Sequence, residues 1–236
     1  MGRENEMAER VIMAEPYPLA FQPNATALLI IDMQRDFLQS GGFGEMLGND
    51  VSLLRSAVAP CQKVLETARA MGLLVIHTRE GHRPDLSDAP PTKLSRGRLA
   101  VGIGDKGPMG RVLVRGEQGH EIIPELSPFP GEPIIDKSGK GSFYETDLDL
   151  MLRNHGIKTL IVCGVTTEVC VHSTVRQAND RGYECVVLSD CVGSYLPEFQ
   201  RAGLAMITAQ GGILGWVSDS SAAISALRSA SSVEEN

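Results

Sequence analysis

The sequence predicts an α/β fold: a single three-layer α/β/α domain built on a mostly parallel, doubly wound sheet. Three observations predict it. Short apolar runs recur along the chain, segments with helical spacing or glycine-rich turns separate them, and 236 residues suffice for one such domain with a sizeable core. Runs that are apolar throughout, rather than alternating, are typical of strands buried on both faces of a parallel sheet.

Six apolar runs are the expected strands, and helical segments separate several of them. The strands are expected at residues 27–31, 73–77, 133–136, 158–163, 184–188 and about 213–217. One helix is expected over 51–71, where apolar residues recur at helical spacing before the Met71-Gly72 stop. Further helices are expected near 146–155, before Gly156, and from Thr174 to Arg181-Gly182.

Three segments lie outside this alternation of strands and helices. Residues 1–24 are polar and contain prolines, and we expect an arm that lies over the surface or a neighbouring subunit. The domain then covers 25–228, and 229–236 is expected to be a flexible tail. Residues 79–131 are rich in glycine, proline and charge, and loops of this length are usually functional lids or subunit contacts.

The composition limits the partners of the protein. A net charge of −7 without a basic cluster argues against nucleic acid, and no apolar run is long enough to span a membrane. The charged start of the chain lacks the apolar core of a signal peptide, so a cytoplasmic protein is expected. Five cysteines without a C-x-x-C pair are expected to be free thiols, and Cys61, Cys163 and Cys185 fit small buried side chains.

Three reactive side chains follow expected strands. Asp32 follows the first strand, Lys137 follows the third, and Cys170 opens the helix after the fourth. Each alone has an ordinary structural explanation: a cap, a solvated charge, an inert thiol. Because the carboxyl ends of parallel strands form one edge of the sheet, their joint placement there predicts a site.

These three residue types suit covalent catalysis by a thiol. A helix N-terminus and the ammonium of Lys137 would favour the thiolate of Cys170, and Lys137 would also position the substrate. Asp32 would take the thiol proton and deliver it to a leaving amine. The turn before Cys170 would direct backbone N–H groups at an oxyanion. His172 is two residues from Cys170 and faces another side of the helix, so a local Cys–His pair is not expected.

Three motifs resemble those of the isochorismatase-like cysteine hydrolases. They are A-L-L-I-I-D-M-Q-R-D-F (27–37), I-I-D-K (134–137) and G-V-T-T-E-V-C (164–170), in the family's order. The resemblance implies that Asp32, Lys137 and Cys170 form a catalytic triad. It also implies a cis peptide between Val165 and Thr166, an oxyanion hole of the Thr166 and Cys170 amides, and a homotetramer.

Within that family, four further segments resemble the biuret hydrolase branch. They are residues 77–85, 102–111, 136–143 and 178–185. This implies a small ureide substrate, with biuret cleaved to allophanate and ammonia; triuret and ureidoacrylate hydrolases are near relatives. Phe37, Glu80, Lys140 and Gln210 are then expected to contact the substrate, whereas Tyr144 is larger than the residue expected at its position.

Two alternatives stay open at this point. Nicotinamidases share the triad but hold a metal with an Asp-x-His pattern, which His77-Thr78-Arg79-Glu80-Gly81-His82 does not contain, so no metal and no cofactor are expected. The fold could also carry a catalytically idle binding protein, since fold alone does not imply function. The presence of all three triad residues favours the enzyme.

Overall fold

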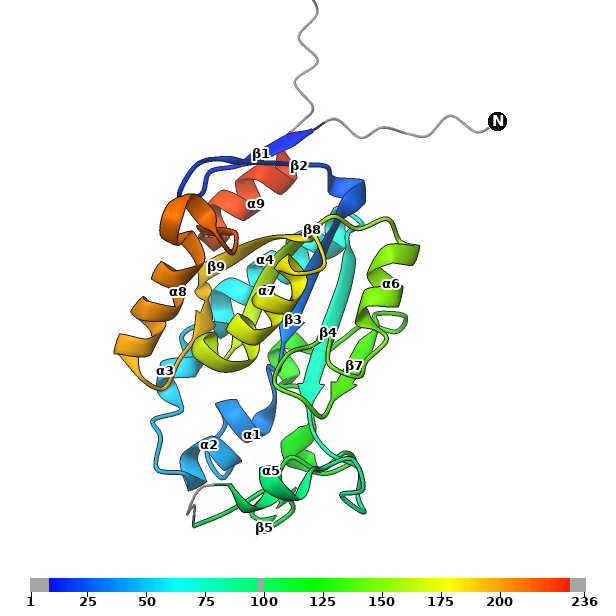
Figure 1. Ribbon diagram of the computed structural model, residues 1–236, viewed down its shortest axis with the longest axis vertical. Coiled ribbons are helices and arrows are strands. Elements are labelled where there is room, and N and C mark those ends of the chain that lie inside the picture. The colour runs from blue at the N-terminus through cyan, green and yellow to red at the C-terminus, as the bar shows by residue number, and fades with distance from the viewer. Residues whose placement is uncertain (1–8, 97–99, 230–236) are drawn as a thin grey trace, which may run out of the picture.

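A six-stranded parallel sheet forms the centre of the molecule (Figure 1). The computed structural model describes residues 9–96 and 100–229. The strands lie in the order β10-β9-β8-β3-β4-β7, and each neighbouring pair is parallel. They are β3 (Thr26–Ile31), β4 (Leu74–Glu80), β7 (Ile134–Lys137), β8 (Thr159–Val165), β9 (Glu184–Gly193) and β10 (Trp216–Ser218). The predicted fold class is confirmed, although β9 continues to Gly193 rather than ending at residue 188.

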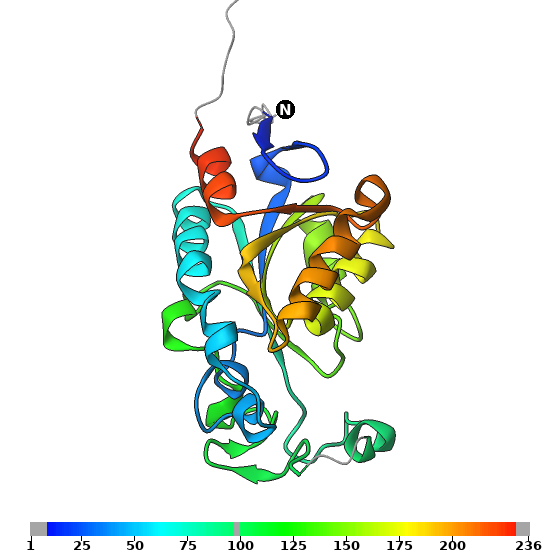
Figure 2. The same cartoon turned by 90° about the vertical axis from the view of Figure 1, so that its left-hand side faces the viewer.

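Helices cover both faces of the sheet (Figure 2). On one face lie α4 (Val58–Ala70) and α9 (Ser220–Arg228), and on the other α6 (Leu148–Asn154), α7 (His172–Asn179) and α8 (Pro197–Gly212). The central strand β3 is buried along its whole length. Its successive side chains point to opposite faces, so Leu28 and Ile30 enter one core while Leu29 and Ile31 enter the other.

The helix predicted over 51–71 is two helices, which corrects that prediction. A short α3 (Ser52–Arg55) ends before α4 begins at Val58. The cause is Pro60, which lacks an N–H and whose ring would clash with the carbonyl of Ser56 in a continuous helix. Within the first turn of a new helix the same proline is tolerated.

The described part of the predicted N-terminal arm packs on its own chain. It forms an antiparallel pair, β1 (Arg10–Ile12) and β2 (Leu19–Phe21), beside α9. Ile12, Leu19 and Phe21 are buried in the same core as α4 and α9. Residues 1–8 of the predicted arm, and residues 230–236 of the predicted tail, lie outside the described residues.

The long segment 79–131 folds beyond the carboxyl ends of the strands, near α1 (Arg35–Leu38) and α2 (Phe43–Met46), as Figure 1 shows. Its elements are α5 (Pro91–Ser95), β5 (Lys106–Gly107), β6 (Gly110–Arg111), η2 (Gln118–His120) and η3 (Pro124–Leu126), and η1 (Pro23–Ala25) precedes β3. The buried carboxylate of Asp36 fastens the segment to α1, since its Oδ2 accepts the Leu113 N–H at 3.0 Å. The segment therefore covers the edge of the sheet at which a site is predicted.

In the described ranges, no helix is both long enough and apolar enough to cross a membrane. The five cysteines are free and buried, so the prediction of free thiols is confirmed.

Candidate active site

The sheet brings Asp32, Lys137 and Cys170 to one buried position. Asp32 directly follows β3, Lys137 is the last residue of β7, and Cys170 lies in the π-helical turn η4 (Thr167–Val171) after β8. Nζ of Lys137 lies 2.7 Å from Oδ2 of Asp32, and both side chains are fully buried. Cys170 is only 4% exposed, so water has little access to its sulfur.

The backbone around the triad is tightly constrained. Gly164 has φ of +122°, and a Cβ on it would lie 2.0 Å from the carbonyl oxygen of Ile31, so only glycine fits beside β3 here. Asp32 itself is in the left-handed region, with φ of +51°. The Val165–Thr166 peptide bond is cis, and η4 follows it at once. This close approach of β8 to β3 is what places the cysteine turn next to Asp32.

Glu80, the last residue of β4, joins the triad. The thiol of Cys170 donates to Oε2 of Glu80 at 3.4 Å, and Nζ of Lys137 lies 4.0 Å from the same oxygen. Gln34 fixes the backbone of Glu80 through two hydrogen bonds, accepting its N–H at 2.7 Å and donating to its carbonyl at 2.9 Å. The structure thus holds Glu80 against the sulfur.

Two further lysines neutralise Glu80. Lys140 donates to Oε1 of Glu80 at 2.6 Å and Lys93 donates to the same oxygen at 3.1 Å. Burial raises the pKa of the Glu80 carboxyl, but the ammonium groups of Lys137, Lys140 and Lys93 outweigh it and lower that pKa to about 2. Glu80 is therefore a fixed anion at neutral pH.

Asp32 and the loop after β7 hold Lys137 in place. Its Nζ forms the ion pair with Asp32 and donates to the Gly139 carbonyl at 3.1 Å and to the Lys140 carbonyl at 2.9 Å. Burial lowers its pKa, but the carboxylates of Asp32 and Glu80 act in the opposite direction, so the net shift is upward and Lys137 stays charged. Lys137 thus orients Asp32 and the loop that carries Lys140, and its contact with the substrate stays a prediction.

The resting state of Cys170 also differs from the expectation. Burial is the largest cause that raises the pKa of Cys170, and the carboxylates of Asp32 and Glu80 raise it further. The ammonium groups of Lys137 and Lys140 lower it, but by less than the other causes raise it. The pKa of the thiol is well above its usual value. The sulfur therefore rests as a thiol that donates to Glu80, not as a thiolate.

The other predicted substrate contacts fall at different places. Lys140 has a side chain that is 49% exposed, and within the described residues only one of its three N–H groups makes a hydrogen bond, so its contact with a substrate stays a prediction that its exposure allows. Phe37 is half-buried on α1, close to the same edge of the sheet. The exposed ring of Tyr144 lies against Gly139, whose Cβ, if present, would be 2.7 Å from it.

Gln210 is not brought to the site, which corrects the prediction that it holds the substrate within this chain. Strands β9 and β10 are parallel, so the chain between them has to cross the length of the sheet. Helix α8 therefore starts near the carboxyl end of β9 and ends near the amino end of β10. Gln210 is exposed near the end of that helix, at the opposite edge of the sheet from Cys170.

Lys93 is a site residue that the sequence did not reveal. It comes from α5 in the 79–131 segment and also donates to the Ser138 carbonyl, so it ties that segment to the loop after β7. Burial lowers the pKa of Lys93, and the negative charge of Glu80 only partly offsets this effect. No motif surrounds it, and only the length of the segment indicated a functional role.

Asp32, Glu80 and Cys170 are also potential metal ligands, because one donor atom of each lies within 4.8 Å of the donor atoms of the other two. The positive charges already present in the cluster argue against a metal ion at this position. The ammonium groups of Lys137, Lys140 and Lys93 already balance the two carboxylates at 2.6–3.1 Å. The donor set thus fits an ion-paired catalytic cluster better than a cation site.

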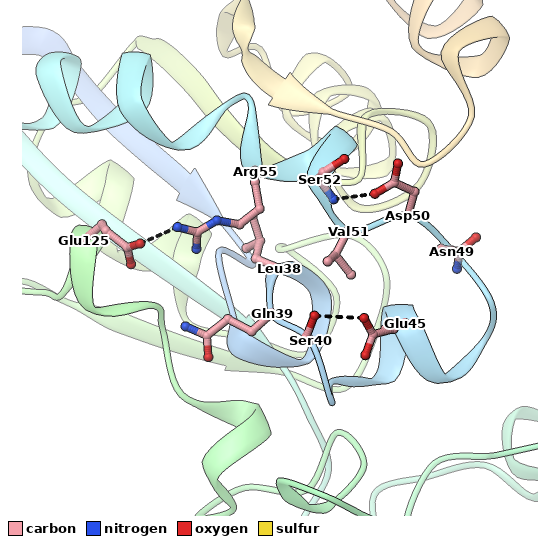
Figure 3. A pocket seen from close by; sticks show the side chains of 10 residues that line it. All are labelled: Leu38, Gln39, Ser40, Glu45, Asn49, Asp50, Val51, Ser52, Arg55 and Glu125. Carbon is pink, nitrogen blue, oxygen red and sulfur yellow. Dashed lines mark hydrogen bonds and ion pairs between the residues drawn. The ribbon is translucent and has the colours of Figure 1, made fainter.

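A surface pocket of about 530 Å³ lies away from this cluster, at α1, α2 and α3 (Figure 3). Its polar groups largely pair with one another, as in the Arg55–Glu125 ion pair and the Ser40–Glu45 hydrogen bond. None of the triad residues lines it; its walls are Leu38, Gln39, Ser40, Glu45, Asn49, Asp50, Val51, Ser52, Arg55 and Glu125.

Comparison with known proteins places the chain in a family. The model of the isochorismatase domain matches residues 26–220. The chain is 34% identical over 220 residues to the ureidoacrylate amidohydrolase RutB of Pantoea ananatis (strain LMG 20103), covering 91% of this chain and 87% of that protein.

Solved structures of other proteins are similar to this chain over most of its length. A cysteine hydrolase from Pseudomonas syringae pv. phaseolicola 1448A has a TM-score of 0.72 at 27% identity, over 88% of this chain and 94% of that one. N-carbamoylsarcosine amidase from Thermoplasma acidophilum has a TM-score of 0.63 at 28% identity, over 83% and 96%. The chain therefore belongs to the isochorismatase family of hydrolases.

Proposed function

We propose that this protein is a cysteine-dependent amidohydrolase that cleaves a C–N bond of a small ureide through a thioester on Cys170. The observation that carries the proposal is the buried cluster of Asp32, Lys137, Cys170 and Glu80. It combines a thiol, a carboxylate held by an ammonium group, and a second carboxylate that accepts from the sulfur. That the chain is a hydrolase acting on amides is supported by its family and by its amidohydrolase and amidase relatives.

The proton of the thiol goes to Asp32. A carboxylate whose pKa is about 2 is a weak base, so Glu80 orients the S–H group but is poorly suited to remove its proton. An oxygen of Asp32 lies within 4.8 Å of the sulfur, so a shift of the Cys170 side chain that brings the two atoms to hydrogen-bond distance would allow the transfer. Lys137 holds Asp32 in place through their ion pair.

Acylation then follows by ordinary acyl transfer. The sulfur forms a bond to the substrate carbonyl carbon, and the electron pair of the C=O bond moves to oxygen, where the Thr166 and Cys170 amides are the proposed donors. The electron pair returns as the C–N bond breaks, and Asp32 gives its proton to the departing nitrogen. A thioester and ammonia result.

Deacylation uses the same carboxylate. Asp32 takes a proton from water, the resulting oxygen nucleophile attacks the thioester carbonyl, and the C–S bond breaks. The proton returns to the sulfur, which restores the thiol and its hydrogen bond to Glu80. The released product is the acid.

The first proposed substrate is biuret, which would be cleaved to allophanate and ammonia. The support for it is the resemblance of four segments to the biuret hydrolase branch: residues 77–85, 102–111, 136–143 and 178–185. Ureidoacrylate is the second, and two observations favour it. A relative with 34% identity is a ureidoacrylate amidohydrolase, and Lys140 offers two unused N–H groups to a carboxylate at the exposed end of the cluster.

A substrate panel tests the function and separates the candidates. Ammonia release is measured from biuret, triuret, ureidoacrylate, N-carbamoylsarcosine and nicotinamide, with the wild-type protein and with Cys170→Ser as the matched blank. Turnover of at least one ureide by the wild type alone supports the proposal, and the ranking identifies the substrate. Turnover of nicotinamide alone, or equal rates in both proteins, overturns it.

A further inference from the structure

A groove of about 330 Å³ lies between α8 and the helical segment that η4 and α7 form. The helices α7 and α8 lie side by side in Figures 1 and 2. Gly203 of α8 permits their close approach, because a Cβ at this position would lie 3.2 Å from a side-chain carbon of Thr167 in η4. The volume is at the lower end of the range for small-molecule sites, which is about 300–1,000 Å³.

The polar wall of the groove is centred on His172, which is only 6% exposed. Nε of Arg176 donates to Nδ1 of His172 at 3.0 Å, so Nδ1 carries no proton. Burial is the largest cause that lowers the pKa of His172, the charge of Arg176 lowers it further, and the Gly203 carbonyl offsets them only in part. The ring is therefore neutral at pH 7, with its proton on Nε2. Within the described residues, this Nε2–H group meets no acceptor in hydrogen-bond geometry.

A carboxylate and a guanidinium group flank this donor. Glu168 precedes His172 by four residues and Arg176 follows it by four, so both lie about one helical turn away on the same face. Oε2 of Glu168 is buried and accepts no hydrogen bond within the described residues. Arg176 is exposed and contacts His172 through Nε, which leaves its Nη groups for another acceptor. Because buried polar atoms without partners are costly, a molecule that supplies both an acceptor and a donor would stabilise this wall.

The opposite wall of the groove is apolar. Phe199 is 46% exposed and Met206 is 51% exposed, and Ala202 lies between them on the same face of α8. A surface helix normally presents polar residues outward. Large apolar side chains that are exposed beside polar groups are typical of a binding groove.

The two walls are complementary to an α-amino acid with an apolar side chain. Its carboxylate would accept from Nε2–H of His172 and from the Nη groups of Arg176, and its ammonium group would donate to Glu168. Its side chain would lie against Phe199 and Met206. The charges of Glu168 and Arg176 cancel and His172 is neutral, so a zwitterion leaves no charge without a partner. A simple anion would leave Glu168 unpaired, and a simple cation would leave Arg176 unpaired.

We infer that the α7–α8 groove is a binding site for a free α-amino acid with an apolar side chain. It is separate from the proposed active site, since neither Lys137 nor Cys170 lines it. Glu168 and Cys170 are both in η4, two residues apart, so the bound molecule would contact the turn that carries the proposed nucleophile.

Isothermal titration calorimetry of the full chain tests the site, with L-leucine, L-methionine and L-phenylalanine as probes. At least one of them is expected to bind with a dissociation constant of about 1 mM or lower. Two analogues of leucine test the recognition of both charges: 4-methylpentanoate lacks the ammonium group and 3-methylbutylamine lacks the carboxylate. Each analogue should bind at least tenfold more weakly than leucine, because one charged wall residue is left without its partner.

Charge-removing variants place the site. Arg176→Gln and Glu168→Gln should each raise the dissociation constant at least tenfold, because each removes the partner of one charge of the zwitterion. Arg201→Gln and Glu198→Gln are the matched controls, since they make the same changes at exposed residues of α8 outside the groove. They should leave the dissociation constant within about twofold of the wild type, as should Lys140→Gln at the proposed active site. Circular dichroism verifies that each variant is folded.

Any of four results would overturn the inference. Three concern the groove: no binding of the three amino acids at about 10 mM, analogues that bind as tightly as leucine, and an unchanged affinity in both Arg176→Gln and Glu168→Gln. The fourth is binding that Lys140→Gln abolishes and the groove variants retain, which would place the amino acid at the proposed active site.

Discussion

At the scale of single residues, the site depends on how charge is balanced around the sulfur of Cys170. Two carboxylates and three ammonium groups meet within a few ångström, and Asp32, Glu80 and Lys137 are buried. Burial and the two carboxylates keep the sulfur protonated at rest, while the lysines keep Glu80 charged. A thiol that loses its proton only as substrate is attacked is less exposed to alkylation and oxidation than a resting thiolate.

Glu80→Gln should lower the pKa of Cys170. The Glu80 carboxylate is one of the causes that raise that pKa, and its removal leaves three ammonium groups facing the single carboxylate of Asp32. We expect the midpoint of the pH profile for iodoacetamide labelling of Cys170 to move down by about one pH unit. Peptide mass spectrometry assigns the label to Cys170 rather than to another thiol.

Glu121→Gln is the control for this measurement, because that glutamate is an exposed partner of Arg35 and is not part of the cluster. It should leave the midpoint at its wild-type value. An unchanged or higher midpoint in Glu80→Gln would contradict the proposed balance of charge.

Chelation should not affect catalysis. Lysines balance the carboxylates of Asp32 and Glu80, so the proposed reaction uses no metal ion. Ammonia release is measured before and after dialysis against EDTA, and again after addition of Zn²⁺ or Mn²⁺. Equal rates are expected throughout, whereas activity that is lost on dialysis and regained with metal would require a different mechanism.

The sequence predicted some residues of the cluster and not others, for a physical reason. Asp32, Lys137 and Cys170 each end a strand or open a helix, and parallel strands share one edge, so their meeting could be anticipated. Lys93 reaches the cluster from an irregular segment whose path no periodicity records. The resting protonation of Cys170 depends on burial, which motif spacing does not measure.

At the scale of elements, the contact between β3 and β8 positions Cys170, the proposed nucleophile. Ile31 pairs with Gly164 at the ends of these strands, and the residues that follow are Asp32 and the turn to Cys170. The space for this contact exists because Gly164 has no side chain. The catalytic geometry therefore depends on the packing of two backbones, and not only on the reactive side chains.

Gly164→Ala should lower both stability and activity. The new Cβ would lie 2.0 Å from the Ile31 oxygen and 2.6 Å from its nitrogen, so the two strands would have to separate. We expect a loss of roughly 3–5 kcal/mol in the free energy of unfolding, measured by urea denaturation.

Gly72→Ala is the matched control, since Gly72 also has a positive φ, of +70°, but has no neighbour within 4 Å of its missing Cβ. It should cost only about 1–2 kcal/mol. Similar losses in the two variants would show that the backbone conformation matters and that the contact with β3 does not.

Strands were easier to predict than the helices and loops between them. The six apolar runs were visible because a strand covered on both faces contains little else, as β3 and β8 illustrate. The split of 51–71 into α3 and α4 arose from a single proline within an otherwise helical pattern. Because β9 and β10 are parallel, α8 has to run back across the sheet, and it takes Gln210 to the edge opposite the site. A motif match does not consider this path of the chain.

At the scale of the whole molecule, partly buried ion pairs connect the layers. Arg69 of α4 makes a two-pronged contact with Glu132, at 2.7 and 2.8 Å, and Glu132 also lies 3.0 Å from His77 of β4. Burial raises the pKa of Glu132, but hydrogen bonds from Arg69, the Phe129 amide and His77, with the charge of Arg69, outweigh it and lower that pKa to about 2.

Glu132→Gln should therefore destabilise the protein in a pH-dependent way. The folded-state pKa is below the usual value of 4.5, so the stabilisation is complete above pH 4.5 and disappears as the pH falls towards about 2. We expect the variant to be less stable by roughly 2–3 kcal/mol at pH 7 and by much less at pH 3. Urea denaturation of both proteins at the two pH values measures the difference, and a difference that is independent of pH would contradict it.

The central claim is that Cys170 is the nucleophile, and Cys170→Ser tests it most directly. Ammonia release is measured on the substrate that the panel identifies, with binding followed separately by calorimetry. The account predicts that the folded variant still binds the substrate but turns it over at least 1,000-fold more slowly, because the hydroxyl is a far weaker nucleophile in the same position. A serine variant that releases ammonia at a rate near that of the wild type would contradict the account.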